Sequence, residues 1–392
     1  MRVTLCFFLI LFLNACGVDV GDGSDGACTD ETFSSARRNY NCQSLTLSGN
    51  LASLFSGVGG SSVIIKVIDS VNIDGSLGAN GADAGTSLAT GLSGALGGAG
   101  GGQGGDCVFD SACGASANDN NGRGDGGGVG GRAGDDPTFF SAASGGGGSG
   151  GSFGTVGSNG ATGSGDGGTT PGPGGVAPGV YGLTNTWDIA FVGGSGGGSG
   201  GYGVFSGASQ SAGGAGGGGG GALRIVAGGD ITIRGTLTAN GGAGGAPETE
   251  LDFSDGGCGG GGSGGAIWLQ AKGNITINGT VSASGGLGDN CTSANEDGGA
   301  GGNGGVGRIR LDDADGAITV TGSVSPAADV SVIGNVEALL TEKREYDGDL
   351  SCGSLAFVDD NQGPPSGPPL QFLMSFLLGL LLCLVVRKSK TN

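Results

Sequence analysis

The stretch Gly265–Gly286, GAIWLQAKGNITINGTVSASGG, has a near-copy at Gly221–Gly242, GALRIVAGGDITIRGTLTANGG, and the two align without a gap. A third copy, VIIKVIDSVNIDGSLGANG, runs from Val63 to Gly81. A fourth, RIRLDDADGAITVTGSVSP, runs from Arg308 to Pro326 and carries one inserted residue. Internal repetition of this kind is typical of proteins built from stacked units. The four copies therefore predict the core of the fold.

Each copy alternates apolar residues with others, which is the period of a β-strand. A glycine separates the second strand piece from the third in every copy, where the chain must turn a corner. The corner glycines are Gly75, Gly235, Gly279 and Gly322. The apolar positions fall into five columns: Val63, Leu223, Ile267 and Ile309; Ile65, Ile225, Leu269 and Leu311; Val71, Ile231, Ile275 and Ile318; Ile73, Ile233, Ile277 and Val320; and Leu77, Leu237, Val281 and Val324.

A single unit of this length cannot bury its apolar edge, whereas stacked units bury it against their neighbours. We therefore predict an all-β fold, a parallel β-helix (solenoid) with glycine-rich excursions. We expect a right-handed coil, because parallel crossovers strongly prefer that hand. An antiparallel sandwich of short hairpins is the alternative.

The composition excludes several classes of protein. Of the 392 residues, 100 are glycine, but they follow no strict three-residue period along the chain, which excludes collagen. Histidine is absent, which excludes Ser-His-Asp and Cys-His catalytic systems and histidine metal sites. Carboxylate-pair chemistry is not excluded. The net charge of −19 makes nucleic acid an unexpected partner.

Residues 1–16, MRVTLCFFLILFLNAC, place one arginine before an apolar run and predict a secretory signal. The ending Leu13-Asn14-Ala15-Cys16 resembles the bacterial lipobox, so we expect lipidation of Cys16. An ordinary signal peptide with an incidental cysteine is the alternative. Residues 17–60 are expected to form an acidic tether and a cap over the N-terminal end of the solenoid.

The first repeat lies in residues 61–85 and the other three lie in residues 221–326. A glycine-rich insertion, residues 86–220, separates them. A structureless insertion of this length is unusual in a compact domain. Two interpretations stay open: a disordered fringe, or glycine-rich chains packed side by side in extended threefold helices.

Residues 327–362 are expected to cap the C-terminal end, and residues 363–369 to form a stiff proline-rich spacer. The apolar run Leu370–Val386 is at the short limit for a membrane span, and basic residues follow it. Residues 370–390 therefore predict a hydrophobic anchor, either retained or cleaved as a sorting tail. The spacer, apolar run and basic end together resemble the tripartite C-terminal tails of bacterial surface proteins.

Seven of the ten cysteines lie in the region expected to be exported, where disulfides form and persist. Because no C-x-x-C motif occurs, we expect structural disulfides and no metal site. Cys352 is left without a neighbour in sequence. The expected pairs are Cys28 with Cys42, Cys107 with Cys113, and Cys258 with Cys291.

Gly101–Phe109, GGQGGDCVF, fits the calcium-binding nonapeptide GGxGxDxUx. That pattern works in tandem and occurs only once here. We therefore expect no cofactor and keep calcium at this segment as the alternative.

Hydroxyl-bearing residues form outward columns beside the apolar ones. Such columns can order water or contact sugars, although β-propensity alone also favours threonine on exposed strands. The columns are Thr232, Thr276 and Thr319, with Asn72; Ser76, Thr236, Thr280 and Ser323; and Thr238, Ser282 and Ser325.

Units such as GGALRIVAGGDITIRGTLTANGGAGG, residues 220–245, resemble the glycine-rich repeats of filamentous-haemagglutinin-type bacterial surface adhesins. The resemblance covers about residues 60–85 and 215–326 and implies a right-handed parallel β-helix. No functional residue of this sequence can be assigned from the resemblance.

These features predict an exported, membrane-anchored protein of the cell envelope or cell surface, with a structural or adhesive role and no catalytic activity. The expected partners are the membrane and extracellular polysaccharide or other cell surfaces. Two alternatives stay open. One is a polysaccharide-active β-helix enzyme, which would need carboxylates, basic residues and aromatics on one face. The other is an ice- or surface-binding solenoid that uses the hydroxyl columns.

Overall fold

The computed structural model describes residues 20–85, 93–107, 121–134, 142–165, 170–181, 191–205, 208–247, 256–291, 297–314 and 317–332. The chain divides into two compact units, Met1–Glu342 and Lys343–Asn392. All described residues belong to the first unit. The expected signal with Cys16, the C-terminal cap after residue 332, the proline-rich spacer and the hydrophobic anchor lie outside them. In the part of the chain that the structure describes, no helix is long and apolar enough to span a membrane.

Regular structure in the described ranges consists of β-strands and one 3-10 turn, η1 (Asp30–Thr32). The strands are β1 (Ala27–Cys28), β2 (Asn39–Cys42), β3 (Ser44–Leu47), β4 (Asn50–Leu51), β5 (Val63–Val67), β6 (Val71–Ile73), β7 (Ser76–Gly78), β8 (Ala142–Ala143), β9 (Gly203–Phe205), β10 (Ala208–Ser211), β11 (Ala222–Ala227), β12 (Ile231–Ile233), β13 (Thr236–Thr238), β14 (Ala266–Ala271), β15 (Ile275–Ile277), β16 (Thr280–Ser282), β17 (Arg308–Asp313), β18 (Ile318–Val320), β19 (Ser323–Ser325) and β20 (Asp329–Val332).

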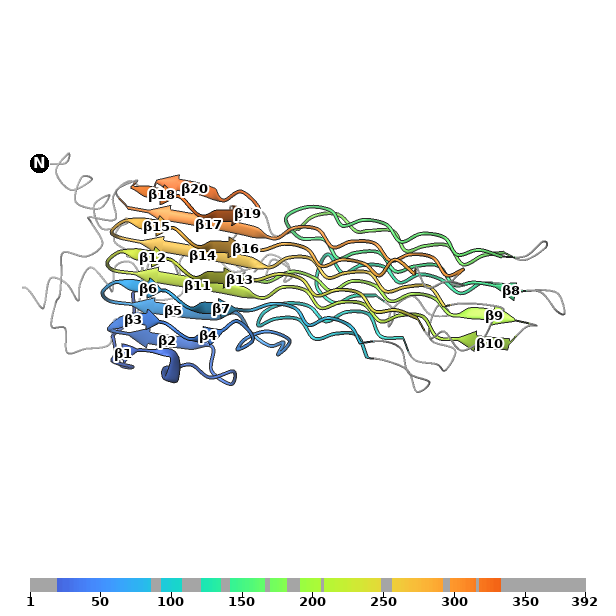
Figure 1. The fold of residues 1–392 in the computed structure, drawn as a ribbon, viewed down its shortest axis with the longest axis horizontal. Coiled ribbons are helices and arrows are strands. Elements are labelled where there is room, and N and C mark those ends of the chain that lie inside the picture. The colour runs from blue at the N-terminus through green and yellow to red at the C-terminus, as the bar shows by residue number, and fades with distance from the viewer. Residues whose placement is uncertain are drawn as a thin grey trace, which may run out of the picture. The chain divides into compact units, whose positions relative to one another are not determined.

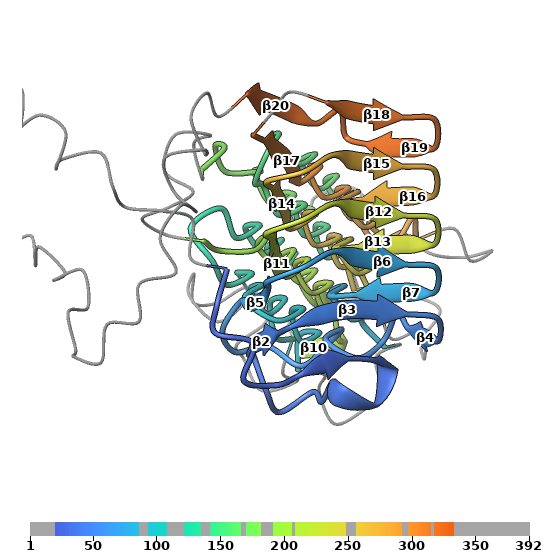
Figure 2. The same ribbon diagram turned by 90° about the vertical axis from the view of Figure 1, so that its left-hand side faces the viewer.

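Three parallel sheets form the solenoid, and each turn contributes one strand to each sheet (Figures 1 and 2). The first sheet has the order β1-β3-β6-β12-β15-β18, the second β2-β5-β11-β14-β17-β20, and the third β4-β7-β13-β16-β19. Their strands pair in the register of the sequence repeats, for example Ile231 with Ile275 and Leu237 with Val281. The parallel solenoid is therefore confirmed, and the antiparallel sandwich is wrong.

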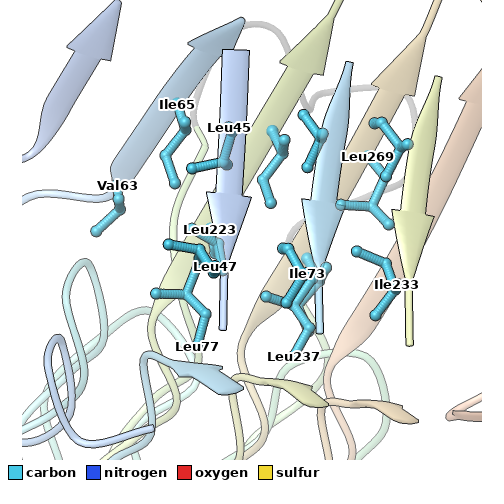
Figure 3. Packing of buried hydrophobic residues seen from close by; sticks show 14 of the residues in the cluster. Leu45, Leu47, Val63, Ile65, Ile73, Leu77, Leu223, Ile233, Leu237 and Leu269 are labelled. Atoms are coloured by element: carbon cyan, nitrogen blue, oxygen red, sulfur yellow. The ribbon is translucent and has the colours of Figure 1, made fainter. Parts of the chain in front are cut away.

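The apolar columns line the interior of the solenoid as ladders of like residues (Figure 3). Ile65, Ile225 and Leu269 occupy one ladder and have no exposed surface. Stacking like side chains in successive turns removes them from water, which supplies the main driving force for the stack.

The residues expected to cap the N-terminal end include a further turn of the solenoid. β2, β3 and β4 pair in parallel with β5, β6 and β7, and Tyr40, Leu45 and Leu47 extend the apolar ladders. The alignment of the sequence repeats did not find this turn, because one residue separates β2 from β3, whereas three separate β5 from β6 in the next turn.

The glycine-rich insertion forms an ordered array wherever the structure describes it. Extended segments run side by side (Figure 1) and are joined by backbone hydrogen bonds that recur at every third residue. Three residues per turn without internal hydrogen bonds is the geometry of a polyproline-II-type helix. Of the two interpretations of the insertion, the packed threefold chains are therefore the one that the structure supports. At the far end of the array, β8, β9 and β10 make a small antiparallel sheet.

The segment 256–265 shows how the array is built. Its backbone N–H groups donate in rotation to three neighbouring segments, and its carbonyl groups accept from three others. The donated bonds are Gly257, Gly260 and Ser263 to Gly201, Gly198 and Ser195; Cys258, Gly261 and Gly264 to Gly299, Gly302 and Gly305; and Gly259, Gly262 and Gly265 to Gly245, Gly242 and Ala239. This segment is therefore surrounded by six others, and its backbone polar groups are satisfied without side chains.

The same hydrogen bonds tie the glycine array to the solenoid. A glycine-rich excursion leaves the third sheet after β7, β13 and β16 and returns to the second sheet at β11, β14 and β17. At each base the returning chain donates to the departing one: Gly221 to Ala79 (2.6 Å), Gly265 to Ala239 (2.7 Å) and Gly307 to Ala283 (2.7 Å). The turns of the solenoid thus continue directly into the array.

Side chains cannot be accommodated where segments face one another. A Cβ atom added to Gly260 would lie 2.1 Å from the Ser149 carbonyl oxygen, and one added to Gly262 would lie 2.0 Å from that of Gly218. Both distances are far inside van der Waals contact. The glycine content therefore follows from the close approach of the backbones.

We predict that Gly260→Ala destabilises the full chain by about 3 kcal/mol, because the new methyl group must push apart the segments that Gly260 joins. Gly179→Ala is the matched control, since a Cβ there would meet nothing within 4 Å. The control should change the free energy of unfolding by no more than about 0.5 kcal/mol. Urea unfolding followed by circular dichroism measures both, and equal effects would contradict the packing described.

Candidate functional site

The outward hydroxyl columns lie in register on the solenoid surface. On the first sheet, Thr232 lies between Asn72 and Thr276, and the missed turn adds Thr46 to the row. On the third sheet, the strand pairs place Ser76, Thr236, Thr280 and Ser323 in one row and Thr238, Ser282 and Ser325 in the next. We call these three sets the hydroxyl rows. Their members are half-buried or exposed, and neighbouring strands lie about 4.8 Å apart.

Polar side chains continue from the third sheet into the glycine array. Asn80 accepts a hydrogen bond from the Asn240 N–H (2.8 Å) through its side-chain oxygen. Asn240 in turn accepts from the Ser284 N–H (2.8 Å) and the Ser282 hydroxyl (2.8 Å). These bonds hold successive turns in register where the strands pass into glycine segments, so the hydroxyl rows end at a fixed boundary.

Residues 154–165, which we call the edge segment, lie at the border of the glycine array. Gly154, Gly157, Gly160 and Gly163 face its neighbours, and the two residues between successive glycines are exposed. It hydrogen-bonds to three neighbouring segments, residues 172–175, 297–306 and 144–150. The exposed side chains are small and uncharged: Thr155, Val156, Ser158, Asn159, Ala161 and Thr162.

The sequence contains a signal for this segment that was missed. Glycine occurs at every third residue from Gly151 to Gly163. The period is local, so the chain as a whole does not show it. The glycine positions identify the side of the segment that packs against neighbouring backbones, and the residues between them identify the side that faces solvent.

A buried polar cluster lies on the outer side of the second sheet. Arg224, Trp268 and Arg310 share one row, and the two guanidinium groups lie 4.0 and 5.0 Å from the indole ring centroid. The indole N–H donates to Asp312 Oδ2 (2.7 Å), and Arg310 Nε donates to Asp312 Oδ1 (2.8 Å). Arg224 Nε donates to the Gln270 side-chain oxygen (2.7 Å). The cluster thus holds its charges by pairing, ring contact and hydrogen bonds.

Residues of the insertion cover this cluster. Phe191 packs against Trp268 with ring centroids 6.1 Å apart, and Phe153 joins the same apolar group. Trp268 is 1% exposed and Asp312 has no exposed surface. Asp312 therefore does not belong to a solvated turn, although an acidic run in a loop would suggest one. The arrangement fastens the array to the solenoid.

Tyr181 belongs to the same covering layer. Its hydroxyl donates to the Gly193 carbonyl (2.8 Å) and accepts from the Ser195 hydroxyl (2.8 Å). Burial raises the pKa of Tyr181 to about 12, although the hydrogen bond from Ser195 acts in the opposite direction. The phenol therefore stays protonated and serves as a structural donor.

The basic residues that an enzyme would need do not converge. Among Lys66, Arg224, Arg234, Arg308 and Arg310, only Arg224 and Arg310 share a row. Lys66 lies in the adjacent row, and Arg234 pairs with Asp74 (2.8 Å) at an exposed corner. Arg308 contacts the Phe153 ring at the edge of the covered cluster.

Two of the expected cysteine pairs form disulfides in the structure, Cys28–Cys42 and Cys258–Cys291. Cys107 is buried and disulfide-bonded, and Cys113 lies outside the described residues. Cys258, Cys291 and Asp289 also place three possible metal-ligand atoms within 4.8 Å of one another. Because the two sulfur atoms are bonded to each other, neither is available as a thiolate ligand.

The segment that fits the calcium pattern lies in the glycine array as far as Cys107. Asp106 accepts hydrogen bonds from the Gly94 N–H (2.6 Å) and from Gln103 (3.4 Å), and Arg123 lies 4.0 Å away. A carboxylate used in this way fastens the segment to its neighbours. Calcium binding here stays an untested alternative.

We predict that Asp312→Asn costs about 3 kcal/mol of unfolding free energy, because it leaves the partly buried Arg310 without its carboxylate. Asp74→Asn removes the partner of Arg234 at a pair whose side chains are 53% and 48% exposed, and should cost less than about 1 kcal/mol. Chemical unfolding followed by tryptophan fluorescence, in a Trp187→Phe background that leaves Trp268 as the emitter, reports on the first site directly. Equal costs would show that the cluster does not fasten the array.

No family model matches this chain. No curated protein and no solved structure matches it either. The resemblance to filamentous-haemagglutinin-type repeats therefore stays a prediction.

Proposed function

We propose that the chain is an exported, envelope-anchored protein that binds an extended surface, such as polysaccharide or another cell, through the hydroxyl rows. The observation that supports this is their register. Thr236, Thr280 and Ser323 repeat at the strand spacing with the hydroxyl-bearing side outward. A ligand that itself repeats could contact several rungs at once, and many weak contacts then add up to firm attachment.

The glycine array fits this role as a rigid support. Backbone hydrogen bonds join a segment such as residues 256–265 to each of the segments around it. A surface held on such a support loses little conformational freedom when it binds. In this proposal the solenoid is a right-handed coil, lipidation of Cys16 and the apolar C-terminal segment supply the anchor, and the solenoid and array supply the displayed surface.

The alternative of a polysaccharide-active enzyme has less support. The cluster that brings together basic, acidic and aromatic side chains is closed, with Trp268 and Asp312 out of contact with solvent. A sugar would have to displace the covering residues Phe153 and Phe191 to reach the carboxylate.

The alternative of ice or another ordered surface is favoured by one observation. The edge segment exposes small uncharged side chains, and Asp297 is the one charged residue among the described residues that hydrogen-bond to it. An assay of ice recrystallisation on the purified chain separates this alternative from binding to polysaccharide.

The test is expression of the full chain in a Gram-negative host. We predict a mature protein whose first residue is a diacylated Cys16, and cells that adhere to cellulose, chitin or dextran beads. Replacing Thr236, Thr280 and Ser323 by lysine should lower adhesion by about tenfold, because several rungs of one row are lost together.

The matched control replaces Thr155, Ser158 and Thr162 of the edge segment by lysine, which adds the same charge at exposed positions away from the rows. The control should adhere like the wild type. A wild type that adheres to no bead, or a control that loses adhesion while the row variant keeps it, would overturn the assignment. An unmodified Cys16 would overturn the lipid anchor.

A further inference from the structure

A carboxylate lies directly against the Cys258–Cys291 disulfide in the glycine array. Asp289 Oδ1 is 3.0 Å from Cys258 Sγ and accepts a hydrogen bond from the Cys291 N–H (3.0 Å). A disulfide sulfur carries no proton, so the contact between the carboxylate oxygen and Cys258 Sγ is not a hydrogen bond. Two cysteine sulfurs beside a carboxylate oxygen are the donor set that proteins use for thiophilic metal ions, zinc above all.

The distances suit a metal site once the two sulfur atoms are separated. The three ligand atoms lie within 4.8 Å of one another. Zn–S bonds are about 2.3 Å and Zn–O bonds about 2.1 Å, so neighbouring ligand atoms of a tetrahedral site lie roughly 3.5 to 3.8 Å apart. The Cα atoms of Cys258 and Cys291 are 5.8 Å apart, which lets side-chain rotation bring the sulfurs to that spacing. The Gly299 carbonyl oxygen, 3.4 Å from Cys291 Sγ, is a further oxygen donor.

The array fixes the backbone around these side chains. The Cys258 N–H donates to the Gly299 carbonyl (2.9 Å), and the Asp289 N–H donates to the Gly259 carbonyl (3.1 Å). Cys258 has no exposed surface, and Cys291 is 7% exposed. The ligands therefore sit on ordered segments, which lowers the entropic cost of binding a metal ion.

The other described disulfide lacks this arrangement. Among the described residues, Cys258, Asp289 and Cys291 are the one group of three possible ligand atoms that lie this close together. Cys28–Cys42 is also a disulfide but belongs to no such group. A structural disulfide thus forms in this chain without a carboxylate beside it, and the position of Asp289 needs another explanation.

We propose that Cys258, Asp289 and Cys291 form a redox-gated site that binds Zn²⁺ when the disulfide is reduced. A dithiol supplies two electrons and two protons: its own sulfurs join in a disulfide, the Cys258–Cys291 bond breaks, and both cysteines become thiols. Zn²⁺ then displaces the two thiol protons, which pass to solvent, and binds two thiolates and the carboxylate. The metal ion links the same two segments that the disulfide linked, so the connection persists in both redox states.

Zinc titration of the reduced full chain tests the site. After reduction with dithiothreitol and its removal without air, the wild type should bind about one more equivalent of Zn²⁺ than Cys258→Ser. Cys28→Ser is the matched control, since it breaks the disulfide that has no carboxylate beside it, and it should bind like the wild type.

Asp289→Asn keeps both cysteines and separates this site from zinc binding by thiols alone. It should lower the zinc affinity at least about tenfold, because even residues that only orient a metal ligand cost this much when replaced. Competition with a coloured zinc chelator measures the affinity, and circular dichroism reports whether each reduced variant is folded.

Three results would overturn the proposal. One is equal zinc stoichiometry in Cys258→Ser and Cys28→Ser. Another is a zinc affinity that Asp289→Asn leaves unchanged, because the thiols would then bind the ion without the carboxylate. The third is a reduced wild type that is unfolded both with and without zinc, because the three ligands would then not be held together.

Discussion

Hydrogen bonds between backbones that carry no side chains are the interaction on which this structure depends. In the glycine array each internal segment meets its neighbours at a distance that a Cβ atom would prevent, as at Gly260 and Gly262. Because the backbones lie this close, the N–H and C=O groups of each extended segment hydrogen-bond to neighbouring segments. A single extended chain has no such hydrogen-bond partners within itself. The array needs almost no apolar core, and this explains how a chain with 100 glycines and few aromatics can be ordered over the described parts of its insertion.

The solenoid and the array stabilise each other through shared turns. Each excursion leaves the third sheet and returns to the second, and bonds such as Gly265 to Ala239 close its base. The solenoid supplies the apolar ladders that fix the register of the turns, and the excursions continue that register outward. The Trp268 cluster and its cover from Phe153 and Phe191 fasten the later part of the insertion to the second sheet. In such a fold the surfaces available for binding are the outward faces of successive solenoid turns. The proposed function therefore rests on the hydroxyl rows.

The solenoid could be predicted from sequence because the pattern that determines it is local and repeated. The alternating apolar residues, the corner glycines and the gapless second copy can all be recognised by aligning the sequence with itself. The turn at Tyr40 was missed because its spacing differs, and it becomes recognisable only when β2 pairs with β5. The array was left open between two interpretations because glycine carries no side-chain pattern; local periods such as those from Gly151 to Gly163 and from Gly298 to Gly307 report its geometry. The buried cluster could be predicted only in part: the repeat alignment places Trp268 in one column with Arg224 and Arg310, but its cover comes from an insertion of irregular spacing.

The most direct test of this account is amide hydrogen exchange of the full chain, read residue by residue. If the glycine segments are hydrogen-bonded as described, the amides of residues 257–265 exchange as slowly as those of Ile231 and Ile275 in the solenoid, because both open only with the whole stack. Exchange of the glycine amides at the rate of an unstructured peptide, with the solenoid strands still protected, would contradict the account. The insertion would then be a disordered fringe on a β-helix.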